Sequence, residues 1–238
     1  MAGKFQGKSI LVAGGTGALG RAVVMSFLDE SAGVAVTYRR QEEFDALKQS
    51  VGSNAQLEGH QVDVTDEDAV RHMTEAIVRK TERIDALVNA VGGYAGGATL
   101  WETESKVFAQ MLALNLNSGY VLSRLIVPVM VKQGSGAIVN VAARAALDHP
   151  ARAAAYAASK AGAVAMINSL AAELKGTGVR VNSVLPSIID SDANRRAMPK
   201  ADFTKWPKPD EIARVILFLC SEEAELIHGA SIPVYGNN

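Results

Sequence analysis

A phenol and an ammonium group stand four residues apart in an alanine-rich stretch of the chain, at Tyr156 and Lys160. On a helix, residues at this spacing lie on one face. A neighbouring cation stabilises a phenolate, so we expect Lys160 to lower the pKa of Tyr156 from its usual value of about 10. Such a tyrosine can exchange a proton near neutral pH. In the alternative, the pair has no catalytic role, and Tyr156 lies at the surface over the aliphatic part of the Lys160 side chain.

A glycine-rich turn near the N-terminus is the second candidate site. It follows an apolar run at 9–13, and its members are Gly14, Gly15, Thr16, Gly17, Ala18, Leu19 and Gly20. Missing side chains let the backbone turn sharply and approach a pyrophosphate, and the free N–H groups that open the next helix attract that anion. A turn of this kind between a first strand and a helix indicates a dinucleotide site. The alternative is tight strand–helix packing without a ligand.

The end of the second expected strand bears on the choice of dinucleotide. An NAD site usually has an acidic residue there for the ribose hydroxyls, whereas this chain has Arg39 and Arg40. Guanidinium groups suit a phosphate in geometry and charge. We therefore expect NADP(H), with NAD(H) still possible, and one or both arginines on the 2′-phosphate. In the alternative, Glu42 and Glu43 pair with the arginines on a solvated surface.

The elements that must position these residues alternate along the chain. Strands are expected at 9–13, 33–38, 57–62, 84–90, 137–141, 179–185 and 231–234, and helices at about 21–30, 41–51, 67–81 and 156–174. Helix-length connections demand parallel pairing, and apolar strands suit a sheet covered on both faces. The expected fold class is α/β: a single-domain, Rossmann-type, doubly wound parallel sheet of about seven strands, spanning 1–238. Ligands then bind beyond the carboxyl ends of the strands.

Composition excludes several other classes of protein. The chain has 238 residues, 48% of them hydrophobic, with 24 basic against 25 acidic side chains and a net charge of −1. These values exclude a disordered or fibrous chain and argue against nucleic acid as a partner. The one cysteine, Cys220, lies in an apolar run and is expected in the core. No three His, Cys or acidic residues have metal-site spacing, so we expect no metal.

The apolar segments of the chain bear on its cellular location and its oligomeric state. The N-terminal stretch Met1 to Ser9 is polar and lacks a signal-peptide pattern, which favours a cytoplasmic protein. The longest uncharged stretch, Val107 to Ser123, contains polar side chains and is expected to form a buried amphipathic helix rather than a membrane span. This helix, to about Met130, and the helix from Tyr156 have small or apolar faces. We expect them to pack across a twofold axis in a homodimer or homotetramer.

These motifs together resemble the short-chain dehydrogenase/reductase family over nearly the whole chain. The matching positions are the turn 14–20, Asp63, Asn89-Ala90-Val91-Gly92, Asn115, Tyr156, Lys160 and the segment from Arg180 to Pro186. The resemblance implies that Tyr156 is the acid/base and that Asn115 orders a water linked to Lys160. It also implies a set of further cofactor contacts. These are Asp63 and Val64 at the adenine, Asn89, Ala90 and Val91 beside the cofactor, and Pro186 and Ile189 near the carboxamide. Asp63 has an alternative role as a capping carboxylate near Thr65.

One departure from the family pattern limits the chemistry. The serine that usually hydrogen-bonds the substrate oxygen is replaced by Ala143. Removing such a donor from an enzyme built to use it costs about 3–4 kcal/mol of barrier. Either the substrate needs little polarisation, or another group replaces the serine, or the protein is a weak catalyst.

A narrower resemblance addresses this departure. The chain is similar to quinonoid dihydropteridine reductases in its glycine turn, in the loop 92–97 and in the segment 185–206, and that subgroup also has alanine at this position. A planar carbonyl or quinonoid-imine substrate is therefore expected, because a quinonoid ring accepts hydride readily. The alternatives are a general ketone or alcohol reductase and a non-catalytic dinucleotide-binding protein.

The expected substrate side is assembled from loops. Its residues are Tyr94, Ala143, Arg144, His149 and Ser187. Tyr94 can stack on a flat small-molecule substrate, and Arg144 is a candidate stand-in for the missing serine. The segment at about 187–209 is expected to form short helices that act as a lid. His60, His72 and His228 are expected at the surface or at helix caps.

Overall fold

The strands form one parallel sheet in the computed structural model, which describes residues 3–52 and 55–237. Met1 and Ala2, part of the polar N-terminal stretch, lie outside these residues. The strands are β1 (Ser9–Ala13), β2 (Gly33–Tyr38), β3 (Leu57–Gln61), β4 (Ala86–Asn89), β5 (Gly136–Val141), β6 (Val179–Pro186) and β7 (Ser231–Val234). Their order is β3-β2-β1-β4-β5-β6-β7, and every pairing is parallel. The expected α/β fold class is confirmed.

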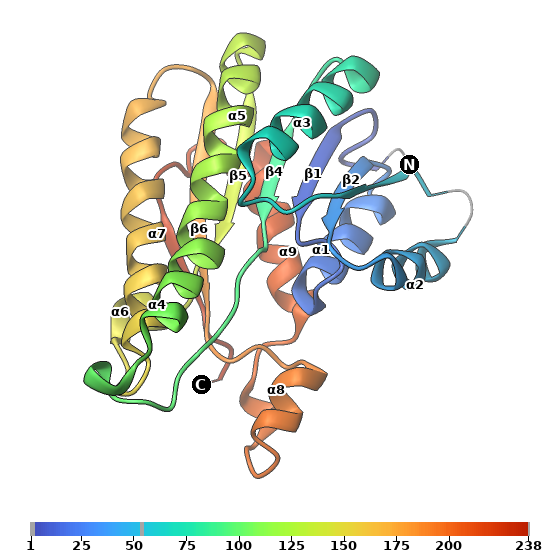
Figure 1. Cartoon of the computed structure of the whole chain (residues 1–238). Helices are drawn as coiled ribbons and strands as arrows, with labels where there is room; N and C mark the ends of the chain where they lie inside the picture. The colour runs from blue at the N-terminus through green and yellow to red at the C-terminus, as the bar shows by residue number, and fades with distance from the viewer. Residues whose placement is uncertain (1–2, 53–54, 238) are drawn as a thin grey trace.

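Helices cover both faces of this sheet (Figure 1). They are α1 (Ala18–Asp29), α2 (Gln41–Val51), α3 (Glu67–Thr81), α4 (Ser105–Leu112), α5 (Ser118–Gln133), α6 (Ala145–Asp148), α7 (Ala154–Glu173), α8 (Asp192–Ala197) and α9 (Pro209–Cys220). A π-helical turn, η2 (Ala113–Asn117), joins α4 to α5, and short 3-10 helices are η1 (Leu100–Glu102), η3 (Phe203–Lys205) and η4 (Glu222–Ala224). The segment expected as a lid contains α8 and η3, so its short helices are confirmed.

Alternation along each strand divides the core into two layers. Ile10 and Val12 of β1 pack with α1, α2 and α9, while Leu11 and Ala13 of the same strand pack with α3, α5 and α7. This period of two places successive side chains on opposite faces of the sheet. Because both faces are covered, β1 is buried along its whole length, as its apolar sequence predicts.

Several element ends differ from the predicted ones. The first helix begins at Ala18, directly after the glycine turn, rather than at Arg21. The fourth strand covers only Ala86–Asn89, because Ile84 bonds through its backbone to the side chain of Gln133 instead of joining the sheet. The alanine-rich helix begins at Ala154, two residues before Tyr156.

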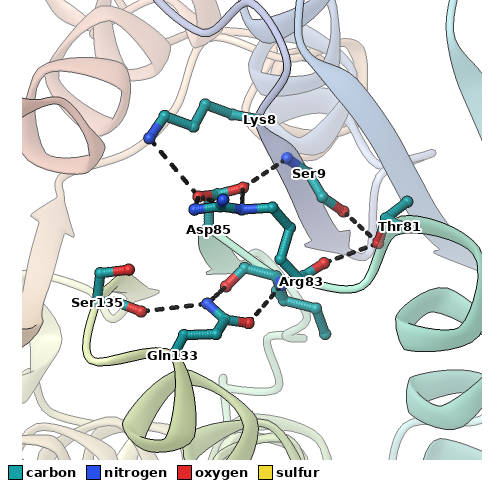
Figure 2. A network of polar contacts seen from close by, with 8 residues as sticks. Lys8, Ser9, Thr81, Arg83, Asp85, Gln133 and Ser135 are labelled. Carbon is teal, nitrogen blue, oxygen red and sulfur yellow. Dashed lines mark hydrogen bonds and ion pairs between the residues drawn. The ribbon is translucent and has the colours of Figure 1, made fainter.

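A polar network joins the elements at the amino ends of β1 and β4, opposite the predicted site (Figure 2). The Asp85 carboxylate accepts the backbone N–H of Ser9 at 2.8 Å and pairs with Arg83 and Lys8. The Thr81 hydroxyl donates to the Arg83 carbonyl at 2.8 Å. These bonds fix the loop between α3 and β4. They hold the amino end of the sheet by groups that take no part in the chemistry described below.

Of the histidines expected at the surface or at helix caps, His60 is largely buried, whereas His228 bonds a carbonyl in the last turn of α7 as a cap residue does. The His60 side chain is only 13% exposed, and burial lowers its pKa. His228 accepts the backbone N–H of Val181 at Nδ1, at 3.2 Å, and donates from Nε2 to the Ala171 carbonyl at 2.6 Å. The neutral ring therefore joins β6 and α7 to the segment that leads into β7. Neither role has a local sequence signal.

The continuous helix Ser105–Gln133 is long and apolar enough to cross a membrane by length and composition. Its α5 part packs on β4, β5 and α3, which makes it a covering layer of the sheet. Phe108, Tyr120 and Val131 remain exposed on it. This face is one of the two expected at a twofold axis, and that assembly stays a prediction.

Candidate active site

The glycine turn has the geometry that its sequence predicts. Gly14 has φ of +75°, in the left-handed region that favours glycine. Its N–H donates to the hydroxyl of Thr37 on β2 at 2.9 Å, and the Gly17 N–H donates to the Gly14 carbonyl at 3.1 Å. Gly17 precedes α1 and provides no side-chain cap, which leaves the opening N–H groups of that helix to other partners. An anion placed there meets these groups and the positive end of the helix dipole.

Steric limits in the turn give a matched pair of variants. A Cβ at Gly20 would collide with the Gly14 carbonyl, whereas a Cβ at Gly17 would stand 3.4 Å from that oxygen, an ordinary contact. We expect Gly20→Ala to lower the free energy of unfolding by about 2 kcal/mol or more and to weaken dinucleotide binding. Gly17→Ala should change the free energy of unfolding by less than about 0.5 kcal/mol.

Urea denaturation followed by tryptophan fluorescence measures the first quantity, and quenching titrations with dinucleotide measure the second. Equal stabilities of the two variants would contradict the steric argument. Because Gly17→Ala keeps the fold, its dinucleotide affinity reports separately how closely the ligand approaches this turn.

A cleft of about 250 Å³ opens beyond the carboxyl ends of the strands, where the strand order reverses between β1 and β4. Its lining includes these expected cofactor residues: Gly14, Thr16, Gly17, Arg39, Asp63, Val64, Ala90 and Val91. Doubly wound sheets bind ligands at this topological switch point. The structure therefore brings the glycine turn, one arginine and the ends of β3 and β4 to one cleft. It also adds residues that sequence reasoning left out of the site: Thr37, Tyr38, Glu43, Val62, Thr65, Gly92 and Leu114.

Asp63 lies near Thr65 as its alternative role predicts, whereas its contact with the adenine stays a prediction. Its carboxylate accepts the N–H and the hydroxyl of Thr65, at 2.9 and 2.7 Å, and these bonds lower its pKa. The residue that caps α3 is Asp66, which accepts the N–H groups of Asp68 and Ala69. Asp63 thus shapes the turn ahead of the helix while lining the cleft.

The Tyr156–Lys160 pair lies in the first half of α7. Lys160 is 5% exposed, and its Nζ donates to the carbonyl oxygen of Val141, at the end of β5, at 2.9 Å. Burial lowers the pKa of Lys160 to about 8. The ammonium group is therefore held at the carboxyl end of the sheet.

The expected low pKa of Tyr156 is wrong for this structure. Burial and, to a smaller extent, the neighbouring Tyr94 raise the pKa of the phenol to about 12. A low dielectric penalises the phenolate, and the Lys160 ammonium that would stabilise it is bound to Val141. The Tyr94 ring meets the Tyr156 ring edge-on, with centroids 5.0 Å apart, while remaining 69% exposed. Tyr94 therefore covers the proton-bearing side chain from the solvent side.

Asn115 fastens the 92–97 loop to α7. It stands in the π-helical turn η2 and is 2% exposed. Its side chain accepts the Gly93 N–H and donates to the Gly93 carbonyl and to the Ser159 hydroxyl, each at 3.0 Å. Ser159 in turn donates to the Tyr156 carbonyl at 2.7 Å. Ser159, which sequence reasoning did not place in the site, thus links Asn115 to the turn that carries the phenol.

Asn115 and Lys160 both lie against Gly92. A Cβ at Gly92 would stand 2.9 Å from Asn115 Oδ1 and 3.1 Å from Lys160 Nζ. The water that the family resemblance places between these side chains stays a prediction. Asn89 shapes the same loop: its Oδ1 accepts the Val91 N–H at 3.2 Å and its Nδ2 donates to Asn140.

The expected substrate residues do not all face one space. Ala143 is buried after β5, and His149 is exposed where α6 ends, with φ of +48°. Arg144 forms an ion pair with Asp148 and lies over the Tyr235 ring, 5.0 Å from its centroid. These contacts commit its guanidinium elsewhere, which argues against Arg144 as the stand-in for the missing serine.

The start of the segment that was expected to form a lid is joined to the C-terminal segment and to the core. The hydroxyl of Ser187 donates to the Tyr235 carbonyl at 2.7 Å. Pro186 is buried at the end of β6 and accepts the Arg144 N–H at 2.8 Å, while Ile189 packs against the α1 and α9 core. Over residues 3–52 and 55–237 no three His, Cys or acidic side chains form a metal-binding group. The absence of a metal stays a prediction.

Comparison with protein families gives a match over most of the chain. The short chain dehydrogenase family model matches residues 8–202. The chain is 32% identical to a 3-oxoacyl-[acyl-carrier-protein] reductase FabG of Thermotoga maritima, covering 98% of both chains. It is also 32% identical to a D-threitol dehydrogenase of Mycolicibacterium smegmatis, covering 98% of this chain and 93% of that one. Neither relative is a dihydropteridine reductase, so the narrower resemblance gains no support.

Solved structures agree with this result. A short chain dehydrogenase from Bacillus anthracis superposes with a TM-score of 0.87 at 29% identity, covering 97% of this chain and 95% of that one. ElxO with NADP bound gives 0.90 at 26% identity, with coverage of 96% and 97%. Xylitol dehydrogenase with NAD⁺ bound gives 0.91 at 25% identity, with coverage of 98% and 99%. Both dinucleotides thus occur among structures similar to this chain.

Proposed function

Because the chain belongs to the short-chain dehydrogenases and is an NAD(P)-dependent oxidoreductase, we propose that it is an NADP(H)-preferring ketone or alcohol reductase. The observation that carries the proposal is that Lys160 and Asn115 meet at Gly92, which lines the cleft, and that Asn115 is linked through Ser159 to the helical turn that carries Tyr156. Tyr156 donates a proton to the substrate oxygen during reduction and accepts it back during alcohol oxidation. Family membership counts against the non-catalytic alternative.

The residues of the cleft fit a dinucleotide. The turn at Gly14 and the close approach of Gly20 to the Gly14 carbonyl keep side chains out of this turn, and no side chain caps the start of α1. NADPH, when bound, supplies the hydride. The protein binds the pyrophosphate at the start of α1, and Asn115 holds the 92–97 loop in place. Lys160 keeps a positive charge near the reacting groups at pH values below about 8.

Tyr94 and Ala143 set the substrate side of the proposal. A buried methyl at Ala143 offers no hydroxyl to a substrate carbonyl, whereas the exposed Tyr94 ring stands beside Tyr156. Tyr94 is positioned to stack on a flat substrate and to hold the substrate oxygen near Tyr156, the proton donor. These two features favour a planar quinonoid-imine as the second candidate substrate.

Arg39 provides the test of cofactor preference. It lines the cleft, and its charge contributes to lowering the pKa values of Glu43 and Asp63. We expect the wild-type enzyme to show a kcat/KM for NADPH at least about tenfold above that for NADH. A charge-assisted bond to a phosphate contributes about 1.5–3 kcal/mol, so Arg39→Ala should lower the NADPH value roughly 10–100-fold.

NADPH and NADH oxidation, followed at 340 nm, provide the readout over a panel of ketones, quinones and quinonoid pterins. A clear NADH preference of the wild-type enzyme would reject the cofactor assignment. Turnover confined to ketones and alcohols supports the leading substrate class, and turnover confined to quinonoid compounds supports the second candidate.

A further inference from the structure

Glu43 lines the cleft although it belongs to α2. The residue that usually distinguishes NAD from NADP stands earlier, at the end of β2. Glu43 stands in the first turn of α2, three residues after Arg40. Its Oε2 accepts a hydrogen bond from the Thr16 hydroxyl at 3.1 Å, and its Oε1 forms an ion pair with Arg40. One carboxylate therefore bridges the glycine turn and the arginines expected at the 2′-phosphate.

The charge of Glu43 is secured by its neighbours. The hydrogen bond from Arg40 lowers the pKa of Glu43 most, and the bond from Thr16 and the charge of Arg39 lower it further. The side chain is 34% exposed, whereas that of Arg40 is 73% exposed. At neutral pH the Glu43 carboxylate is therefore negatively charged at this end of the cleft. It is bound to the Arg40 guanidinium, which is more exposed to solvent than the carboxylate.

An anionic side chain at this place acts differently on the two dinucleotides. A 2′-phosphate carries close to two negative charges and needs free guanidinium donors. Glu43 occupies donors of Arg40 and repels the phosphate. A ribose with a free 2′-hydroxyl instead donates to a carboxylate, the interaction that an acidic strand-end residue supplies in NAD sites.

We propose that Glu43 is a specificity-determining residue that holds back NADP(H) and supports NAD(H), so that Arg39 carries the 2′-phosphate contact largely alone. The proposal rests on the dinucleotide site of the proposed function. Specificity is a difference between two affinities, and a repulsive group contributes to it as directly as an attractive one. The enzyme's preference is accordingly the balance of Arg39 against Glu43.

The test compares Glu43→Gln with Glu42→Gln. Both changes remove one negative charge from the first turn of α2, but Glu42 is exposed and does not line the cleft. Dissociation constants for NADPH and NADH are measured by fluorescence titration. Adenosine 2′,5′-bisphosphate and 5′-AMP serve as probes that engage only the adenosine end of the site.

We expect Glu43→Gln to tighten NADPH and the bisphosphate about tenfold and to weaken NADH and 5′-AMP about threefold. Glu42→Gln should change the ratio of the two affinities less than about twofold, because exposed charges are screened. Glu43→Asp, which keeps the charge, should stay closer to the wild-type ratio than Glu43→Gln does. Matching thermal melts of the variants exclude a folding defect as the cause.

The role of Glu43 is overturned if Glu43→Gln leaves the ratio of NADPH to NADH affinity within about twofold of the wild-type ratio. It is also overturned if Glu42→Gln shifts that ratio as much as Glu43→Gln does. If the wild-type enzyme still prefers NADPH in that case, the proposed cofactor stands. Conversely, a wild-type preference for NADH that Glu43→Gln moves toward NADPH supports Glu43 and rejects the proposed cofactor. The two proposals therefore fail separately.

Discussion

Tyr156→Phe is expected to lower kcat roughly 10²–10⁴-fold, the contribution typical of a positioned acid or base, while the dissociation constant for NADPH changes less than about threefold. The phenylalanine ring keeps the edge-on contact that Tyr156 makes with Tyr94 at 5.0 Å. Only the hydroxyl is lost, and with it the proton for the substrate oxygen. Stopped-flow hydride transfer and fluorescence titration separate the two effects.

Tyr94→Phe is the matched control, because it removes the other phenol of the same ring pair. It should retain most of kcat with NADPH and a ketone. The assignment fails if Tyr156→Phe keeps wild-type activity, or if Tyr94→Phe alone abolishes turnover.

The pKa of Tyr156 also fixes a direction for the pH profile. Since burial and Tyr94 raise that pKa to about 12, the phenol stays protonated through neutral pH. Ketone reduction, which needs the proton, should show no loss from this group between about pH 6 and 9. Alcohol oxidation needs the phenolate, so its rate should rise with pH across the same range.

Lys160→Met is expected to abolish most activity while making the fold more stable. The pKa of Lys160 falls from 10.5 to about 8 on burial, which corresponds to about 3 kcal/mol spent on holding the ammonium in the folded chain at pH 7. Methionine avoids this cost but loses the bond from Nζ to the Val141 carbonyl. We expect a net gain of roughly 1–2 kcal/mol in the free energy of unfolding at pH 7.

The sign of the pH dependence makes this prediction sharper. Between about pH 8 and 10.5 the unfolded chain binds more protons at Lys160 than the folded chain does, so wild-type stability gains from this residue as pH rises. The advantage of Lys160→Met should therefore shrink from pH 7 to pH 10. Urea denaturation at both pH values measures it, and Lys132→Met at an exposed position of α5 is the control. A variant less stable than wild type at pH 7 would contradict the argument.

The fold was predictable because its determinants are local. The limits of α3, at Glu67 and Thr81, and of β7, at Ser231 and Val234, match the predicted ranges. Strand alternation and turn residues act within a few positions and are visible in one sequence. The glycine turn is equally local, since its conformation depends on missing side chains.

The electrostatics of the site were less predictable because they depend on distant contacts. Tyr94 covers Tyr156 from a loop 62 positions earlier in the chain, and that contact together with burial reverses the expected shift in the pKa of the phenol. Arg144 is bound by Tyr235 and Asp148, of which only Asp148 is near in sequence. The dihydropteridine reductase subgroup gains no support from the relatives, because resemblance in short loops carries less information than identity along the whole chain.

The π-helical turn at Ala113–Asn117, which is wider than an α-helical turn, lies between the two halves of one long helix. It determines in which direction the side chains of one half point relative to those of the other. Ahead of it α4 packs on α7, and after it α5 packs on the sheet. A residue more or less in an α-helix turns every later side chain by about 100°. Deleting one residue from α4, with the wide turn kept, would leave helix length and hydropathy almost unchanged, yet one half would turn its apolar side to water and carry Asn115 away from Gly93. The alignment of the two halves thus depends on a residue count rather than on any single side chain.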